Sequence, residues 1–166
     1  MKLATAHRIL FALLTLSCAG CGYQWKSTYR EDVRTVSVPI FQNKTFERGA
    51  EVALTKAVVN RLELHSPYKV TNRDKADTIL EGEITQVSLK QLSRDLNTDL
   101  PQEKQIIYLI DFRWKDLRTG RILVERRNFQ QQAIYYPTLG EAEYNGSQLA
   151  IEKVALAIVQ ELEAEW

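Results

Sequence analysis

Alternating apolar and polar residues predict five β-strands along the chain. The strongest alternation covers residues 105–116, where every second residue from Ile106 to Trp114 is apolar. The segment "RTGR", residues 118–121, follows this strand and predicts a tight hairpin turn in which Gly120 takes a positive φ. The other predicted strands cover residues 33–41, 68–71, 77–89 and 122–136.

The predicted strand at residues 77–89 contains a slip in its alternation. Leu80, Gly82 and Ile84 share one face, whereas Val87 and Leu89 fall on the other. A slip of this kind indicates either a β-bulge at residues 85–86 or a strand that outgrows the covered part of its sheet.

The first predicted helix covers residues 47–64. Its apolar residues recur at helical spacing on one face, with polar residues on the other. Asn43 or Thr45 is placed to cap its N-terminus. Ser66 and Pro67 end it, because the residue before a proline avoids the helical region.

The second predicted helix lies at the C-terminus of the chain. It carries a full apolar stripe from Ile151 to Leu162. Its start has two candidates: a capping box formed by Thr138 and Glu141, or the first residue after residues 145–146, "NG".

The order of predicted elements is β-α-β-β-β-β-α, with a long polar loop at residues 90–104. No repeat or internal linker divides this order. Helices and strands that each carry one apolar face bury it when both helices pack on one side of a single sheet. We therefore predict an α+β fold, a two-layer sandwich in which two helices pack on one face of a mainly antiparallel four- to five-stranded sheet.

The N-terminal residues have the pattern of an export signal. A basic segment with Lys2 and Arg8 precedes a continuous apolar run at residues 9–16, and small residues follow. The apolar run is much shorter than the roughly 20 residues that a membrane-spanning helix needs. We therefore expect a cleaved signal rather than a permanent membrane span.

The two cysteines of the chain, Cys18 and Cys21, end this segment. Their C-x-x-C spacing also occurs in redox pairs and zinc sites, but a redox pair belongs beside a strand–helix unit and a zinc site needs about four ligands. The segment resembles a bacterial lipobox, with Cys21 as the lipidated residue and Cys18 as the poorer alternative. The predicted divisions are a lipoprotein signal peptide at residues 1–20, a lipidated tether at 21–32 and a folded domain at 33–166.

Composition describes a folded, nearly neutral mature chain. Removing residues 1–20 leaves 146 of the 166 residues and takes Lys2 and Arg8 from the 22 basic side chains, so 20 remain against 21 acidic ones. This near balance gives no field that would attract nucleic acid. No cysteine follows Cys21, so packing rather than disulfide bonds must stabilise the fold.

No constellation of side chains predicts catalysis. His65 is the only histidine after residue 20 and ends a predicted helix, where a cation interacts favourably with the helix dipole. Glu81 and Glu83 lie on one face of a predicted strand, as paired carboxylates do in glycosidases, but a half-solvated strand gives the same pattern. Neither a serine-nucleophile motif nor a phosphate loop is present. We therefore expect a protein that is not an enzyme and has no cofactor or metal.

Three segments together resemble the LPS-assembly lipoprotein family LptE, in the form found outside the enteric bacteria. They are "CGY" at residues 21–23, "VSVPIFQNKTFERGAE" at 36–51 and "ADTILEGEI" at 76–84. The resemblance implies a lipoprotein on the periplasmic face of the outer membrane, which assembles with and plugs the LptD β-barrel for lipopolysaccharide transport. Gly22 agrees with outer-membrane delivery, because an Asp at this position would resemble an inner-membrane retention signal.

Members of the resembled family are thought to contact lipopolysaccharide, which makes the basic residues at and below the predicted hairpin of interest. Forked guanidinium groups suit the phosphates of such a ligand. The alternative is that these charges keep the hairpin soluble and free of edge-to-edge association. No family motif transfers a ligand-binding residue by position. The candidates are Arg118, Arg121, Arg126, Arg127 and Lys115.

Two other functions remain open on the sequence alone. Envelope lipoproteins that activate a cell-wall synthase or build a secretion pore also resemble the chain in its "ADTILEGEI" strand. A periplasmic enzyme is the other alternative, and the lack of a reactive constellation argues against it. The partner recovered from membranes distinguishes the adaptor functions from one another.

Overall fold

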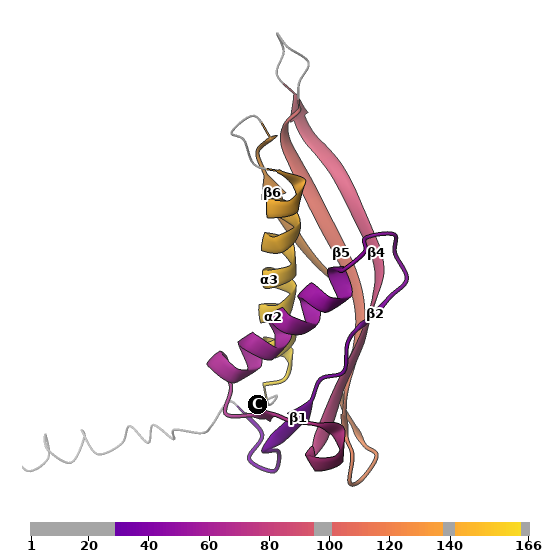
Figure 1. Ribbon diagram of the computed structural model, residues 1–166, viewed down its shortest axis with the longest axis vertical. Helices are drawn as coiled ribbons and strands as arrows, with labels where there is room; N and C mark the ends of the chain where they lie inside the picture. The colour runs from indigo at the N-terminus through magenta and orange to yellow at the C-terminus, as the bar shows by residue number, and fades with distance from the viewer. Residues whose placement is uncertain (1–28, 95–100, 138–141, 164–166) are drawn as a thin grey trace, which may run out of the picture.

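The computed structural model describes residues 29–94, 101–137 and 142–163. The predicted signal peptide, Cys21 and most of the predicted tether lie outside these residues. The described chain forms two layers, with two helices on one face of a long sheet (Figure 1). Among the described residues, the search for helices long and apolar enough to cross a membrane found none. The predicted α+β, two-layer class is confirmed.

Three long strands form most of the sheet. β4 (Thr78–Arg94), β5 (Pro101–Asp116) and β6 (Ile122–Tyr135) pair antiparallel in chain order. The turn between β5 and β6 contains Gly120 with a φ of 75°, which confirms the predicted hairpin. These strands form the antiparallel part of the sheet that the sequence predicts.

Three short strands join the other edge of β4 in parallel. β1 (Thr35–Ser37) lies between β4 and β3 (Lys69–Val70), and β2 (Gln42–Asn43) pairs with β4 further along. Of the predicted strand at residues 33–41 only Thr35–Ser37 forms, because Pro39, which has no N–H group, follows it; β2 lies beyond the predicted end. The sheet is mixed and has six strands, one more than the upper predicted count, with the antiparallel part the larger.

A β-bulge in β4 explains the slip in the sequence pattern. The pairing register with β5 shifts between Ile84 and Gln86, which leaves Thr85 as the extra residue. Val87 and Leu89 are thereby returned to the face that carries Ile84, the face under the helices. The predicted bulge is confirmed.

β4 and β5 are longer than predicted. β4 continues to Arg94 and β5 begins at Pro101, so the prediction of a loop is wrong for residues 90–94 and 101–104. The rest of the predicted loop, residues 95–100, lies outside the described ranges. The two strands project beyond the helices at one end of the molecule (Figure 1). Because no helix covers either face of this projection, polar residues occupy both faces and the alternation disappears.

The first helix is α2 (Ala50–His65). It begins three residues later than predicted, with Gly49 at the N-cap in a left-handed conformation (φ 86°), so the prediction that Asn43 or Thr45 caps it is wrong. Its C-cap is Ser66, as predicted. Gly49 takes the N-cap position because its φ is one that residues with a side chain adopt only under strain.

The second helix is α3 (Glu143–Glu161). It begins between the two predicted starts, with Ala142 at the N-cap. Thr138 and Glu141, the predicted capping box, lie outside the described residues. The predicted apolar stripe faces the sheet, and α3 packs against β5, β6 and α2.

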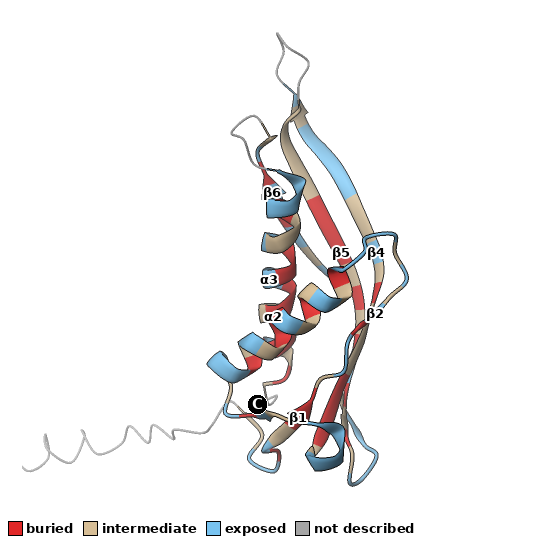
Figure 2. Ribbon diagram, viewed as in Figure 1, coloured by how far each residue is buried: buried red, intermediate tan, exposed pale blue. Residues whose placement is uncertain are grey.

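The core fills the space between the helices and the sheet (Figure 2). All five alternating residues of β5, from Ile106 to Trp114, are buried there, as predicted. Burying a side chain of this size contributes about 1.5–3 kcal/mol. The fully covered residues of the helices include Leu54, Val58 and Leu62 from α2 and Ala150, Val154 and Ile158 from α3.

Candidate functional site

The β5–β6 turn holds two of the five predicted basic candidates. The carboxylate of Asp116 accepts hydrogen bonds from the backbone N–H groups of Arg118 (2.7 Å) and Thr119 (3.0 Å). The Arg118 guanidinium pairs with Asp116 at 3.6 Å and donates to the carbonyl of Asp32 at 3.2 Å. Arg121 is exposed, and among the described residues no carboxylate pairs with it. The turn thus presents two guanidinium groups at one end of the molecule.

The other three candidates are separated from this turn. Arg126 faces the helices, where its guanidinium pairs with Glu161 of α3 at 2.6 Å. Arg127 pairs with Glu125 at 3.4 Å, on the face that the helices leave open. Lys115 lies lower on that open face, in register with Ile79 and Ile122. The five cations therefore do not form one cluster.

Arg126 and Arg127 lie on opposite faces because neighbouring residues of a strand alternate, and a bulge in β6 comes directly after Arg126. The register with β5 shifts between Ile110 and Phe112, and Asn128 adopts a φ of 53°. The backbone N–H of Asn128 donates to the Asp111 carboxylate at 2.7 Å. β6 is an edge strand of the described sheet, so this bulge interrupts a free edge.

The two strand carboxylates Glu81 and Glu83 belong to ion pairs on the open face. Glu81 pairs with Arg113 at 3.2 Å and approaches Arg73 at 4.0 Å, while Glu83 pairs with Lys44. Both carboxylates line an open groove of about 550 Å³ together with Arg73 and Arg113. Each carboxylate thus has a cationic partner from a neighbouring segment, which is the half-solvated strand pattern rather than a pair converging on a substrate.

His65 ends α2, as the sequence predicts. Its ring lies 3.2 Å from the guanidinium of Arg61, and its carbonyl accepts a hydrogen bond from the hydroxyl of Tyr29. In the described part of the chain, no group of three or more histidine, cysteine or acidic side chains is arranged to hold a metal ion. The surroundings of His65 are those of a helix terminus.

Asn43 organises the turn between β2 and α2. Its amide group donates to the Glu47 carbonyl (2.8 Å) and to the Glu51 carboxylate (2.7 Å). Its side-chain oxygen accepts from both the backbone N–H and the hydroxyl of Thr45, each at 2.8 Å. The backbone N–H of Glu51 and then the Asn43 amide lower the pKa of the Glu51 carboxyl. Asn43 and Thr45 therefore close the turn that leads into the helix instead of capping it.

We expect Asn43→Asp to destabilise the protein by about 2 kcal/mol. The substituted carboxylate has the same shape, but it cannot donate to Glu47 and it adds a negative charge beside Glu51. Urea unfolding at neutral pH measures the change. Asn60→Asp, on the exposed side of α2, is the matched control and should stay within about 0.5 kcal/mol. Equal losses in the two variants would exclude a special role for the Asn43 amide.

An aromatic stack of Tyr29, Tyr68 and Trp114 attaches the start of the described chain to the core. Successive rings lie 5.6 Å apart, and the Arg30 guanidinium lies 6.0 Å from the Trp114 ring centroid. The backbone N–H of Arg30 donates to the Tyr68 hydroxyl at 3.0 Å. The sequence did not predict this contact. The aromatic residues of the predicted tether were its only signal, and they do not recur with the period of a helix or a strand.

Asp77 joins the same end of the molecule to β1. Its carboxylate accepts from the Thr35 hydroxyl (2.9 Å) and from the backbone N–H groups of Thr35 (3.0 Å) and Arg34 (3.1 Å). The Thr35 hydroxyl is the largest cause that lowers the pKa of the Asp77 carboxyl. A short 3-10 helix, η2 (Arg73–Lys75), leads into this residue. These contacts fix the geometry of the surface around the β5–β6 turn.

The fold and these surfaces define a small two-layer α+β domain, with charged side chains in cross-strand ion pairs and an N-terminal segment packed on the core. Comparison with known families identifies the family to which this domain belongs. A family model described as lipopolysaccharide-assembly, LptE, matches residues 33–166. The chain belongs to the LptE family of lipopolysaccharide-assembly lipoproteins, which is a non-enzymatic family, and the resemblance in the sequence is confirmed. A search of curated proteins found no match.

Several solved structures share this fold at low sequence identity. An uncharacterized lipoprotein B from Nitrosomonas europaea is 12% identical with a TM-score of 0.59, over 87% of this chain and 91% of that one. A PelC dodecamer subunit from Paraburkholderia phytofirmans is 12% identical with a TM-score of 0.55, over 84% and 96%. The hypothetical protein CT253 from Chlamydia trachomatis is 10% identical with a TM-score of 0.53, over 76% and 96%. At these identities the likeness shows the fold alone.

Proposed function

We propose that the protein is an outer-membrane lipoprotein that assembles with and plugs a β-barrel of the LptD type, through which lipopolysaccharide is transported. The match to the lipopolysaccharide-assembly family over residues 33–166 carries this proposal. Lipid attached to Cys21 would hold the domain at the periplasmic face of the membrane, since several acyl chains together give stable anchoring.

The shape of the domain supports a place inside a barrel. A barrel wide enough to pass a lipid head group encloses a polar lumen that needs to be filled. The β4–β5 projection carries polar residues on both faces, including the exposed Lys90 and Gln91. Apart from the half-exposed Leu89 and Leu92 of β4, such a projection presents polar side chains to an aqueous lumen.

Recovery of the partner tests the proposal. The full chain, tagged at its C-terminus and purified from detergent-solubilised membranes, should bring down a large outer-membrane β-barrel that mass spectrometry identifies. Cys21→Ala should reduce the recovery, because the chain then lacks its anchor. Recovery of a cell-wall synthase, or of a ring made only of this chain, would contradict the proposal and support the alternative adaptor functions.

Direct contact with lipopolysaccharide is a separate part of the proposal. Of the five basic candidates, Arg118 and Arg121 alone share the β5–β6 turn. Arg126 already pairs with Glu161 of α3, and Arg127 with Glu125 of its own strand. If the hairpin has a phosphate ligand, Arg118 and Arg121 are therefore the residues that hold it.

A further inference from the structure

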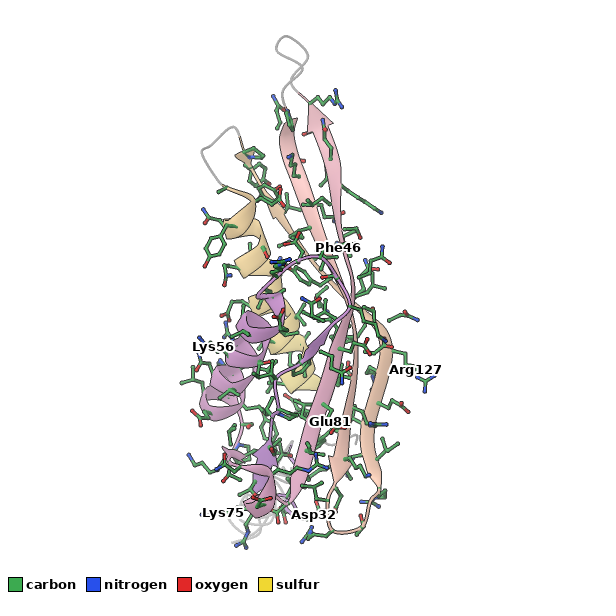
Figure 3. All side chains as sticks on the ribbon, turned by 45° about the vertical axis from the view of Figure 1, so that its right-hand side comes forward. Asp32, Phe46, Lys56, Lys75, Glu81 and Arg127 are labelled. Atoms are coloured by element: carbon green, nitrogen blue, oxygen red, sulfur yellow. The ribbon has the colours of Figure 1, made fainter. Side chains whose placement is uncertain are left out.

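Three segments far apart in the sequence meet at one end of the molecule. The Arg118 guanidinium donates to the Asp32 carbonyl at 3.2 Å, and the Thr35 hydroxyl donates to the Lys75 carbonyl at 3.4 Å. Figure 3 shows Asp32 and Lys75 at this end, away from the β4–β5 projection. We call the exposed cations gathered here the basic tether-end surface: Arg34, Lys69, Lys75, Arg118 and Arg121.

The charges on this surface are available to a ligand. Among the described residues, no carboxylate lies within ion-pairing distance of the other four cations, and Arg118 has only the longer contact with Asp116 at 3.6 Å. The carboxylates of Asp77 and Asp116 accept hydrogen bonds from backbone N–H groups. These hydrogen bonds weaken the attraction between the two carboxylates and the nearby cations. Within the segments that carry these cations, residues 31–35, 69–75 and 117–121, the exposed acidic residues are Glu31, Asp32 and Asp74. The exposed side chains are therefore in cationic excess.

The length of the tether places this surface near the membrane. Tyr29 comes eight positions after Cys21, and an extended chain over eight steps reaches at most about 29 Å. Tyr29 is held by the aromatic stack at the same end as the basic surface. β4 has 17 residues and spans about 55 Å from this end of the molecule to the β4–β5 projection. Because that distance exceeds the reach of the tether, the projection lies away from the lipid anchor when the tether end lies beside it.

We propose that the basic tether-end surface binds the phosphates of anionic phospholipids in the leaflet that holds the lipid anchor. The inference rests on the lipid attachment in the proposed function, and it concerns the anchored subunit before it joins its barrel. Guanidinium groups bind phosphate through paired hydrogen bonds. Each Lys or Arg near an anionic leaflet strengthens binding about fivefold, and the effect extends about one Debye length, 8–10 Å.

While the subunit is free, the ligand of the β5–β6 turn is then phospholipid rather than lipopolysaccharide of the outer leaflet. The hydrocarbon core between the two leaflets is about 30 Å thick. Arg118 and Arg121 belong to the end of the domain that the tether holds beside the anchor leaflet. Phosphates of the opposite leaflet are therefore out of reach of these side chains while the subunit is free.

Fluorescence quenching in vesicles tests the inference. The full lipidated chain with Thr119→Cys carries a fluorophore at the turn, and Gln91→Cys carries it on the β4–β5 projection as a reference. Vesicles contain a headgroup-labelled quencher in phosphatidylcholine, with or without phosphatidylglycerol. We expect the quenching constant at residue 119 to rise about fivefold with phosphatidylglycerol, to fall again in high salt, and to stay unchanged at residue 91.

Charge reversal provides the matched comparison. Lys75→Glu with Arg121→Glu should abolish the rise, whereas Lys90→Glu with Lys153→Glu, which changes the net charge equally, should preserve it. Equal quenching in both vesicle types would overturn the inference, and so would a rise with lipopolysaccharide but none with phosphatidylglycerol. Barrel recovery from the same variants separates the two proposals. A recovered barrel without the quenching rise overturns only this inference, and a rise without a barrel overturns only the proposed function.

Discussion

Gly82→Ala is expected to destabilise the protein by about 3 kcal/mol. A Cβ atom on residue 82 would lie 2.1 Å from Cε1 and 2.5 Å from Cδ1 of the Phe41 ring. The ring cannot move aside easily, because Phe41 is 2% exposed and its backbone N–H donates to the Thr55 hydroxyl of α2. Overpacking typically costs about 1–3 kcal/mol, and a fixed aromatic ring gives the upper end of that range. Urea unfolding monitored by circular dichroism measures the loss.

A double-mutant cycle isolates this contact. Phe41→Ala alone should cost about 3–5 kcal/mol through the cavity that it leaves. The new methyl group at residue 82 then occupies part of that cavity, so the double variant should lose at least about 1 kcal/mol less than the sum of the single losses. Strict additivity would show that the methyl group and the ring do not collide.

Trp114→Ala is expected to cost about 4 kcal/mol and to release the N-terminal segment from the core. Trp114 is completely buried and contacts both Tyr68 and the guanidinium of Arg30. Its loss removes the last ring of the aromatic stack, so residues 29–34 should exchange their amide hydrogens faster than the rest of the sheet. Hydrogen exchange followed by mass spectrometry detects this local effect, and urea unfolding gives the global one.

Trp114→Phe serves as the conservative comparison. A phenyl ring preserves the contact with Tyr68 and leaves a smaller cavity, so the loss should be about 1–2 kcal/mol. Exchange at residues 29–34 should then remain close to that of the original chain. Equal exchange of this segment in the Ala and Phe variants would mean that the stack does not hold it.

Local patterns predict much of this fold. The alternation in β5, the apolar stripes of the helices, the turn at Gly120 and the bulge after Ile84 are all properties of neighbouring residues. The projection of β4 and β5 was missed because water reaches both of its faces, which removes the apolar signal. The parallel pairing of β1 with β3 and β4 depends on residues more than 30 positions apart, so periodicity does not specify it.

The candidate surfaces were predictable only in part. Sequence neighbours such as Arg118 and Arg121 stay together in space, because a tight turn holds them. Arg126 is drawn away by Glu161, 35 positions along the chain, and the alternation of β6 places Arg127 on the opposite face. The family motifs predicted the class of protein. The contacts that position the N-terminal end, such as Tyr68 with Trp114 and Asp77 with Thr35, join residues far apart in the sequence, so no local pattern predicts them.

The bulge at Asn128 bears on how the purified subunit behaves at high concentration. β6 exposes a row of unpaired N–H and C=O groups, and three consecutive glutamines, Gln130 to Gln132, follow the bulge in a composition that favours fibril-like stacking. A left-handed residue in the middle of the strand bends that row, so another chain can align with only a short stretch of it. The kink thus shortens the stretch of β6 on which a second copy of the chain could be templated.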